Sequence, residues 1–265
     1  MPIFGETCPQ YLELTQRCLC SPGGEGNKFL CSPPLRSEAD QAALYAALRR
    51  GDLQVVSSDH SAYNFGGGAA ASKTAGGPST PFSKVPMGLP GLECRMPLIV
   101  SAALSGKLSG LEQVVRVGCT NPAKLYGLYP RKGTLCVGSD ADIVLWDAAA
   151  ERVIRKEALH DDLDYTPYEG IKLRGAVVRT LLRGRTVYAR GAPDAVSAVR
   201  GGGQFVASGK PDLLGWGGVF PDTADVVEQS AFALLGPALD CESAASDTDE
   251  AETRKRARRE EEEEE

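Results

Sequence analysis

Apolar residues recur at helical spacing from residue 38 to residue 50, and a short, mostly apolar run from Leu53 to Val56 follows. Ser37 is a suitable N-cap for the first segment, and Gly51 suits its end. The second segment has the composition of a buried strand. A helix followed directly by a buried strand is typical of α/β folds with parallel strands, so we expect this region to adopt one.

Helical patterns return after residues 66–81, which lack periodicity and are predicted to form a long, mobile loop. Three further helices are expected, at Glu93–Leu108, Leu111–Val117 and Pro122–Leu128. Thr120 or Asn121 is a suitable cap for the last of them, because proline fits the first position of a helix. Residues 1–138 are therefore predicted to form an α/β region.

The pattern changes to that of strands at Ile143. Strands are expected at Ile143–Trp146, Val177–Leu182 and Thr186–Tyr188, with Gly184-Arg185 at the turn of a hairpin. Residues 139–195 are thus predicted to be a small β-rich module appended to the α/β region. Residues 196–265 are rich in Gly and Ser and then strongly charged, which predicts a disordered acidic tail.

Composition narrows the possible partners. Hydrophobic residues make up 42% of the chain and charged residues 24%, which is close to the globular average. The six glutamates at 260–265 account for the net charge of -6, so the remaining body is close to neutral and nucleic acid is not an expected partner. No apolar run approaches the ~20 residues of a membrane span, and Met1–Phe4 lacks the features of a signal peptide.

The eight cysteines are scattered, and the one-residue gap in Cys18-Leu19-Cys20 is too short for the usual zinc-ligand spacing. Reduced, mostly structural thiols are the expected state. A cytoplasmic protein that does not bind membranes is therefore predicted.

The most informative chemistry lies at the end of the predicted strand, where Ser57 and Ser58 lead into Asp59 and His60. The carboxyl ends of parallel strands surround active sites in α/β folds, and a carboxylate there is able to bind a metal or accept a proton. The alternative is that Asp59 caps a loop and His60 is simply packed. Spacing alone favours this alternative, and adjacent strand residues point to opposite faces, so His60 is not expected to be a second ligand.

Seven segments occur in order between roughly residues 5 and 192: GETCPQYLELT (5–15), CSPPLR (31–36), GDLQVVSSDHSAYNF (51–65), KVPMGLPGLECRM (84–96), TNPAKLYGLYPRKGTLCVGSDADIVLWD (120–147), LDYTPYEG (163–170) and LLRGRTVYARG (181–191). Together they resemble the C-terminal half of the dihydropyrimidinase/hydantoinase family of cyclic amidohydrolases. The resemblance implies part of a (β/α)8 barrel with part of a β-sandwich module, in a protein that is commonly a homotetramer.

The resemblance also implies a catalytic centre with two divalent metals, usually Zn2+, bridged by a hydroxide and a carboxylated lysine. Asp59 matches a metal ligand that also shuttles a proton to the leaving nitrogen. Ser32 and Met87 match positions whose backbone groups bind the ring of a cyclic ureide, although methionine replaces the usual asparagine at the second one. The other metal ligands of the family precede the segment at residue 5, so we expect this chain to be a fragment that is inactive alone and binds zinc poorly.

Three functions remain open. A dihydropyrimidinase would open 5,6-dihydrouracil and dihydrothymine to N-carbamoyl-β-amino acids in pyrimidine degradation, and this is the function that we predict. A hydantoinase or allantoinase would act on a related ureide. A non-catalytic relative, similar to the collapsin response mediator proteins, would use the fold for assembly, but such relatives typically lack the metal aspartate that Asp59 matches.

Overall fold

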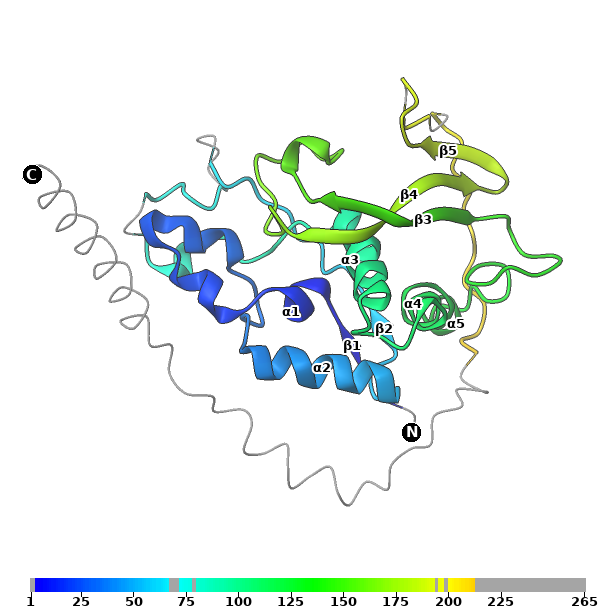
Figure 1. Cartoon of the computed structure of the whole chain (residues 1–265), viewed down its shortest axis with the longest axis horizontal. Coiled ribbons are helices and arrows are strands. Elements are labelled where there is room, and N and C mark those ends of the chain that lie inside the picture. The colour runs from blue at the N-terminus through cyan, green and yellow to red at the C-terminus, as the bar shows by residue number, and fades with distance from the viewer. Residues whose placement is uncertain (1–2, 67–71, 78–79, 194, 198–199, 213–265) are drawn as a thin grey trace, which may run out of the picture.

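The computed structural model describes residues 3–66, 72–77, 80–193, 195–197 and 200–212. The first part of the chain contains β1 (Glu6–Thr7), α1 (Pro9–Glu13), 3-10 helices at Gln16–Cys20, Pro22–Phe29 and Phe82–Lys84, α2 (Glu38–Arg50) and β2 (Val55–Val56). The second part contains α3 (Leu92–Leu104), α4 (Leu111–Val115), a π-helical turn (Arg116–Thr120), α5 (Asn121–Leu125), β3 (Ile143–Val153), a 3-10 helix (Lys156–Ala158), β4 (Lys172–Leu182) and β5 (Arg185–Ala189). Figure 1 shows the β3–β5 sheet on one side of α3 and α2 on the other, an arrangement of mixed α and β elements.

Helix α2 begins and ends as predicted. The side chain of Ser37 accepts a hydrogen bond from the backbone N–H of Asp40, and the Asp40 carboxylate accepts one from the backbone N–H of Ser37 in return. Gly51 ends the helix in the left-handed conformation, with φ of 89°. Reciprocal capping at one end and a glycine at the other explain why local sequence was sufficient to predict this helix.

Strands β1 and β2 form a parallel pair, as the helix–strand pattern predicted. Glu6 pairs with Val55 and Thr7 with Val56, which is fully buried. The regular strand is shorter than the predicted Leu53–Val56, and next to it the Gln54 side chain accepts a hydrogen bond from the backbone N–H of Gly5. This pair sets where the segment after Val56 emerges from the fold.

Helix α4, the π-helical turn and α5 form one continuous helix. The prediction that Thr120 or Asn121 caps a separate helix is therefore wrong. Thr120 has helical backbone angles, and its hydroxyl donates to the carbonyl oxygen of Gly133. The Asn121 amide donates to the carbonyl oxygen of Gln54 at 2.7 Å. The π-helical turn carries the helix across Pro122, which has no N–H to donate.

Strands β3, β4 and β5 form an antiparallel sheet, with β4 in the centre. The predicted hairpin is confirmed, with its turn one residue earlier than expected, at Arg183 and Gly184, which have φ of 48° and 77°. Two successive positive φ values are characteristic of the tight turns that match strand twist. The sheet packs on α3 at Gly175, where a Cβ atom would lie 2.9 Å from Leu104 Cδ1.

A buried cluster joins the two predicted regions, because Leu98 of α3 packs with Ile154 and Leu173 from the β-rich part. The boundary at residues 138 and 139 stays a prediction. Within the predicted tail, the backbone N–H of Gly209 donates to Gly127 at 2.8 Å, so this stretch contacts the end of α5. The acidic end of the tail, residues 213–265, lies outside the described residues.

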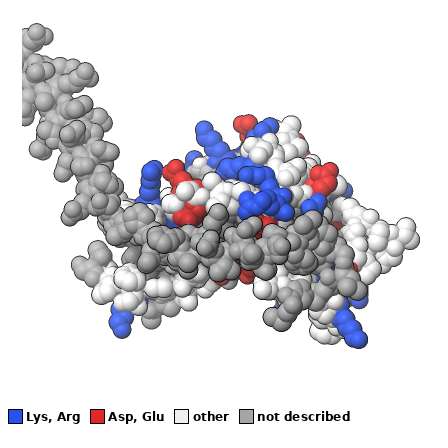
Figure 2. Space-filling model, turned by 90° about the horizontal axis from the view of Figure 1, so that it is seen from below, with Lys and Arg blue, Asp and Glu red and all other residues white. Residues whose placement is uncertain are grey.

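Six cysteines are free thiols, as predicted: Cys8, Cys18, Cys31, Cys94, Cys119 and Cys136. Cys20 differs from the expectation, because it is disulfide-bonded. Basic and acidic side chains are mixed on the face shown in Figure 2. Among the described residues, no helix is both long enough and apolar enough to cross a membrane.

Candidate active site

Asp59 follows β2 after two serines and lies at the surface. One carboxylate oxygen, Oδ2, accepts a hydrogen bond from Gln10 Nε2 at 2.8 Å. Gln10 is only 1% exposed and lies in α1, so a buried amide holds an exposed carboxylate. The backbone φ of Asp59 is 46°, a left-handed conformation that aspartate tolerates better than most residues. Asp59 therefore does not cap a helix, and its other oxygen, Oδ1, has no hydrogen bond within the described part of the chain.

His60 caps a helix instead. Its Nδ1 atom accepts hydrogen bonds from the backbone N–H groups of Gly91 at 3.1 Å and Leu92 at 3.2 Å, at the start of α3. In a neutral ring the proton is then on Nε2. His160 is exposed, and its ring contacts Glu93 at 2.9 Å.

Ser32 lies in an exposed turn with a cis bond to Pro33. The carbonyl oxygen of Pro33 accepts from the Tyr11 hydroxyl at 3.0 Å and from the Cys31 thiol at 3.2 Å. Burial raises the pKa of Tyr11, and it raises the pKa of Cys31 to about 11. Both groups therefore keep their protons at neutral pH and continue to donate to this turn.

Met87 lies in a second turn, with 40% of the residue exposed. The next residue, Gly88, donates from its backbone N–H to Leu30 at 3.0 Å. A Cβ atom at Gly88 would lie 2.5 Å from the carbonyl oxygen of Ser61, so only glycine permits this approach. Ser61 in turn donates to the carbonyl oxygen of Leu89 at 3.0 Å. The structure thus brings the turns of Ser32, Asp59 and Met87 together through their backbones.

Two buried side chains in this region had no role in the sequence prediction. Gln10 lies in the segment 5–15 that resembles the family, but no function was predicted for it. Lys73 lies in the Gly- and Ala-rich stretch that was predicted to be a mobile loop, yet it is only 1% exposed. Its Nζ atom donates to the carbonyl oxygens of Leu30 and Pro86 at 3.0 and 2.9 Å. A lysine in an aperiodic stretch gives no signal of burial, so the sequence could not have identified it.

The described residues do not form a metal site by themselves. Within them, no group of three or more His, Cys, Asp or Glu side chains is placed to hold an ion. Asp59 offers one carboxylate, whereas tight binding of a divalent transition metal requires several converging ligands. The candidate site as described therefore consists of neighbouring turns with one exposed carboxylate beside them.

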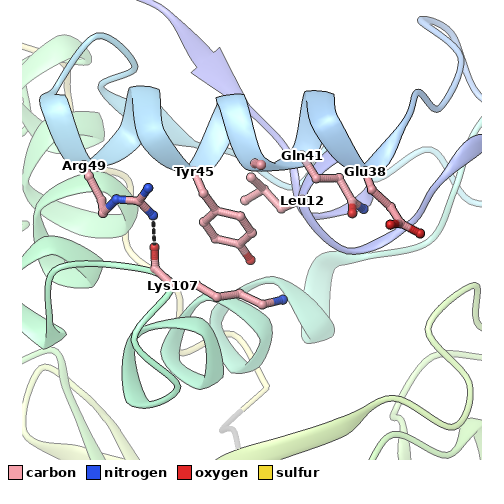
Figure 3. A pocket seen from close by; sticks show the side chains of 7 residues that line it. Leu12, Glu38, Gln41, Tyr45, Arg49 and Lys107 are labelled. Carbon is pink, nitrogen blue, oxygen red and sulfur yellow. Dashed lines mark hydrogen bonds between the residues drawn. The ribbon is translucent and has the colours of Figure 1, made fainter.

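A separate hollow of ≈ 320 Å³ lies beside α2 and is drawn in Figure 3. Its polar side chains already have partners: Arg49 donates to the carbonyl oxygen of Lys107 at 2.6 Å, and the Lys107 ammonium lies 3.1 Å from Glu13. Neither Asp59 nor the two turn residues line it. The hollow is therefore distinct from the candidate site.

Comparison with known proteins gives a consistent result. A model described as the Amidohydrolase family matches residues 19–187. The D-hydantoinase of Streptomyces coelicolor is 46% identical over 187 residues, which cover 71% of this chain and 38% of that protein. The D-hydantoinase of Rhizobium radiobacter is 44% identical over 188 residues, covering 71% and 40% of the two chains. The chain therefore spans about two fifths of the length of these relatives.

Solved structures show the same relation. A dihydropyrimidinase from Brevibacillus agri superimposes with a TM-score of 0.65 at 44% identity, covering 69% of this chain and 39% of that one. A D-hydantoinase structure gives a TM-score of 0.71 at 40% identity, covering 77% and 42%. The similarity thus extends from sequence to the arrangement of α and β elements.

Proposed function

Because this chain belongs to the amidohydrolase family, we propose that it carries part of the active site of an enzyme that hydrolyses cyclic amides. The proposed substrates are 5,6-dihydrouracil and dihydrothymine. Water cleaves the ring C–N bond, the carbonyl carbon becomes a carboxylate, and the nitrogen leaves as part of an N-carbamoyl-β-amino acid. The similarity to proteins named dihydropyrimidinase and D-hydantoinase supports a cyclic ureide as substrate.

The proposed architecture is the C-terminal part of a (β/α)8 barrel with part of a β-sandwich module. The parallel pair β1–β2, connected through α2, is what two successive barrel strands require. The antiparallel sheet β3–β5 supplies the β-rich module. A homo-oligomer, with four copies as the family resemblance implies, stays a prediction.

One observation carries the proposal: the turns that contain Ser32, Asp59 and Met87 are distant in sequence and lie together just after the end of β2. Ser32 and Met87 are proposed to bind the ring through backbone groups, which is compatible with methionine at position 87. Asp59 is proposed to accept a proton and return it to the leaving nitrogen. It is also proposed to contribute one carboxylate to a zinc centre whose other ligands come from outside the described residues.

Hydantoin, a five-membered cyclic ureide, is the second candidate substrate, because the curated relatives cited above are named D-hydantoinase. Both candidates use the same reaction. The two substrates differ in ring size and substituents, so the rates at which each ring is opened distinguish the two candidate functions.

A chimera tests the proposal. The 187-residue segment of the Streptomyces coelicolor D-hydantoinase that matches this chain is replaced by its counterpart from this chain. We expect the chimera to open dihydrouracil faster than hydantoin. Preference for hydantoin would favour the second candidate. A folded chimera that opens neither ring, beside an active parent enzyme, would refute both.

A further inference from the structure

Lys73 is the most deeply buried charged side chain near the candidate site. Backbone carbonyl oxygens, rather than a carboxylate, accept its hydrogen bonds. Its ammonium has three donors, and two of them bind the carbonyl oxygens of Leu30 and Pro86. No Asp or Glu forms an ion pair with it within the described residues. Burial lowers the pKa of Lys73 to about 8.

A buried ammonium without a carboxylate is costly, and a methionine of similar length would fill the same volume without that cost. Packing alone therefore does not explain a lysine here. The two carbonyl acceptors give a different reason, because they belong to different segments of the chain, one preceding the Ser32 turn and the other preceding the Met87 turn.

The bonds around Lys73 form a small closed network. Leu30 lies two residues before Ser32, and Pro86 lies immediately before Met87. The carbonyl oxygen of Leu30 accepts from Lys73 and also from the backbone N–H of Gly88. The Lys73 ammonium thus connects the residues that precede both turns. The carbonyl oxygen of Leu30 adds a second link, because it also accepts from Gly88 in the Met87 turn. Displacement of either turn would break a charge-assisted hydrogen bond inside the protein.

We propose that Lys73 is a positioning residue, which fixes the spacing between the Ser32 turn and the Met87 turn so that their backbone groups bind one ring together. This inference rests on the proposed function for its ligand, but the network itself is independent of any ligand. Lys73 does not touch the substrate in this account. It acts through Leu30 and Pro86.

The test uses the full chain labelled with 15N, as wild type and as Lys73→Met, which keeps the length and removes the donors. Lys84→Met is the matched control, because Lys84 is exposed and lies two residues before Pro86. Hydrogen exchange is measured at the Gly88 amide and across α2. A titration with 5,6-dihydrouracil then follows the amide signals of Ser32 and Met87.

In Lys73→Met we expect the Gly88 amide to exchange about tenfold faster or more, while α2 stays within about twofold of wild type. We also expect dihydrouracil affinity to fall by about tenfold or more, with the shifts at Ser32 and Met87 no longer saturating together. Lys84→Met should match wild type in both measurements. A lysine with only a general structural role would change exchange in α2 as much as at Gly88.

Unchanged exchange at Gly88 in folded Lys73→Met would overturn the proposal, and so would unchanged affinity in a protein that binds the ring. Wild type that shows no shift with dihydrouracil would count against the proposed function, while Gly88 exchange still decides the role of Lys73. Should Lys73→Met not fold, Lys73→Gln replaces it: its shorter side chain cannot reach both acceptors, so faster exchange is again expected and an unchanged rate again overturns the proposal.

Discussion

In the β4–β5 hairpin of the sheet, paired residues are close in sequence, as where Leu182 pairs with Arg185 across a two-residue turn. Around Asp59 the opposite holds: Gln10 reaches Asp59 over 49 positions, and Lys73 reaches Leu30 over 43. The sheet is stabilised by a repeating backbone ladder, whereas the candidate site is fixed by isolated hydrogen bonds, some between backbone groups and some from buried polar side chains. The two regions should therefore respond differently to substitution, and local perturbation should damage the site more selectively than the sheet.

The largest expected difference is between folding and activity. The purified chain of 265 residues should form the β3–β5 sheet and yet open no dihydrouracil and bind less than one zinc per chain. The reason is that, among the described residues, Asp59 is the only carboxylate that we propose as a metal ligand. Metal analysis and a ring-opening assay on the same preparation check this. Stoichiometric zinc together with turnover would contradict it.

Within the sheet, the largest effect is expected at Gly175, which combines φ of 85° with close contact to α3. Gly175→Ala should lower the free energy of unfolding by about 2 kcal/mol, from left-handed strain and overpacking together. Gly184→Ala is the control, because its φ is also positive but its Cβ would meet nothing closer than 4.0 Å. Denaturant titration measures both, and equal losses would show that contact with Leu104 contributes nothing.

The difference between local and long-range contacts also explains which features could be predicted from the sequence. Helix α2, the parallel pair and the hairpin were predictable because capping residues, apolar runs and turn residues act within a few positions. The place of Asp59 at the end of β2 was also predictable. Its partner Gln10, the helix-capping role of His60 and the burial of Lys73 were not, because each depends on a contact with a segment distant in sequence. The resemblance of quoted segments identified the family, but it could not show what holds the turns together.

The buried lysine gives the candidate site a pH dependence in the alkaline range. The folded pKa of Lys73 is lowered to about 8 from 10.5, so between these values the unfolded chain binds more protons and stability rises with pH. Between pH 8 and 9, wild type should gain about 1 kcal/mol relative to Lys73→Met. The comparison with the variant removes the opposing effect of buried thiols such as Cys31, whose raised pKa favours unfolding above pH 9. Parallel pH profiles for the two proteins would contradict this prediction.

The smallest expected effects come from the two histidines, His60 and His160. His60→Ala should destabilise the chain by about 1 kcal/mol or less, because two backbone N–H groups of α3 lose their acceptor. His160→Ala should change stability less, since its contact with Glu93 is exposed. Thermal unfolding of the two variants side by side measures the difference. A larger loss of stability in His160→Ala than in His60→Ala would contradict the role of His60 as the cap of α3.

The account depends most on Asp59, and the most direct test is the rate of dihydrouracil ring opening by the chimera carrying Asp59→Asn. Asparagine keeps the side-chain shape and tolerates the left-handed backbone, so folding should be unchanged while proton transfer and the carboxylate charge are lost. We expect the rate to fall by about 10²- to 10⁴-fold, with the same thermal unfolding as the parent chimera. A rate within about threefold of the parent would show that this carboxylate takes no part in the reaction.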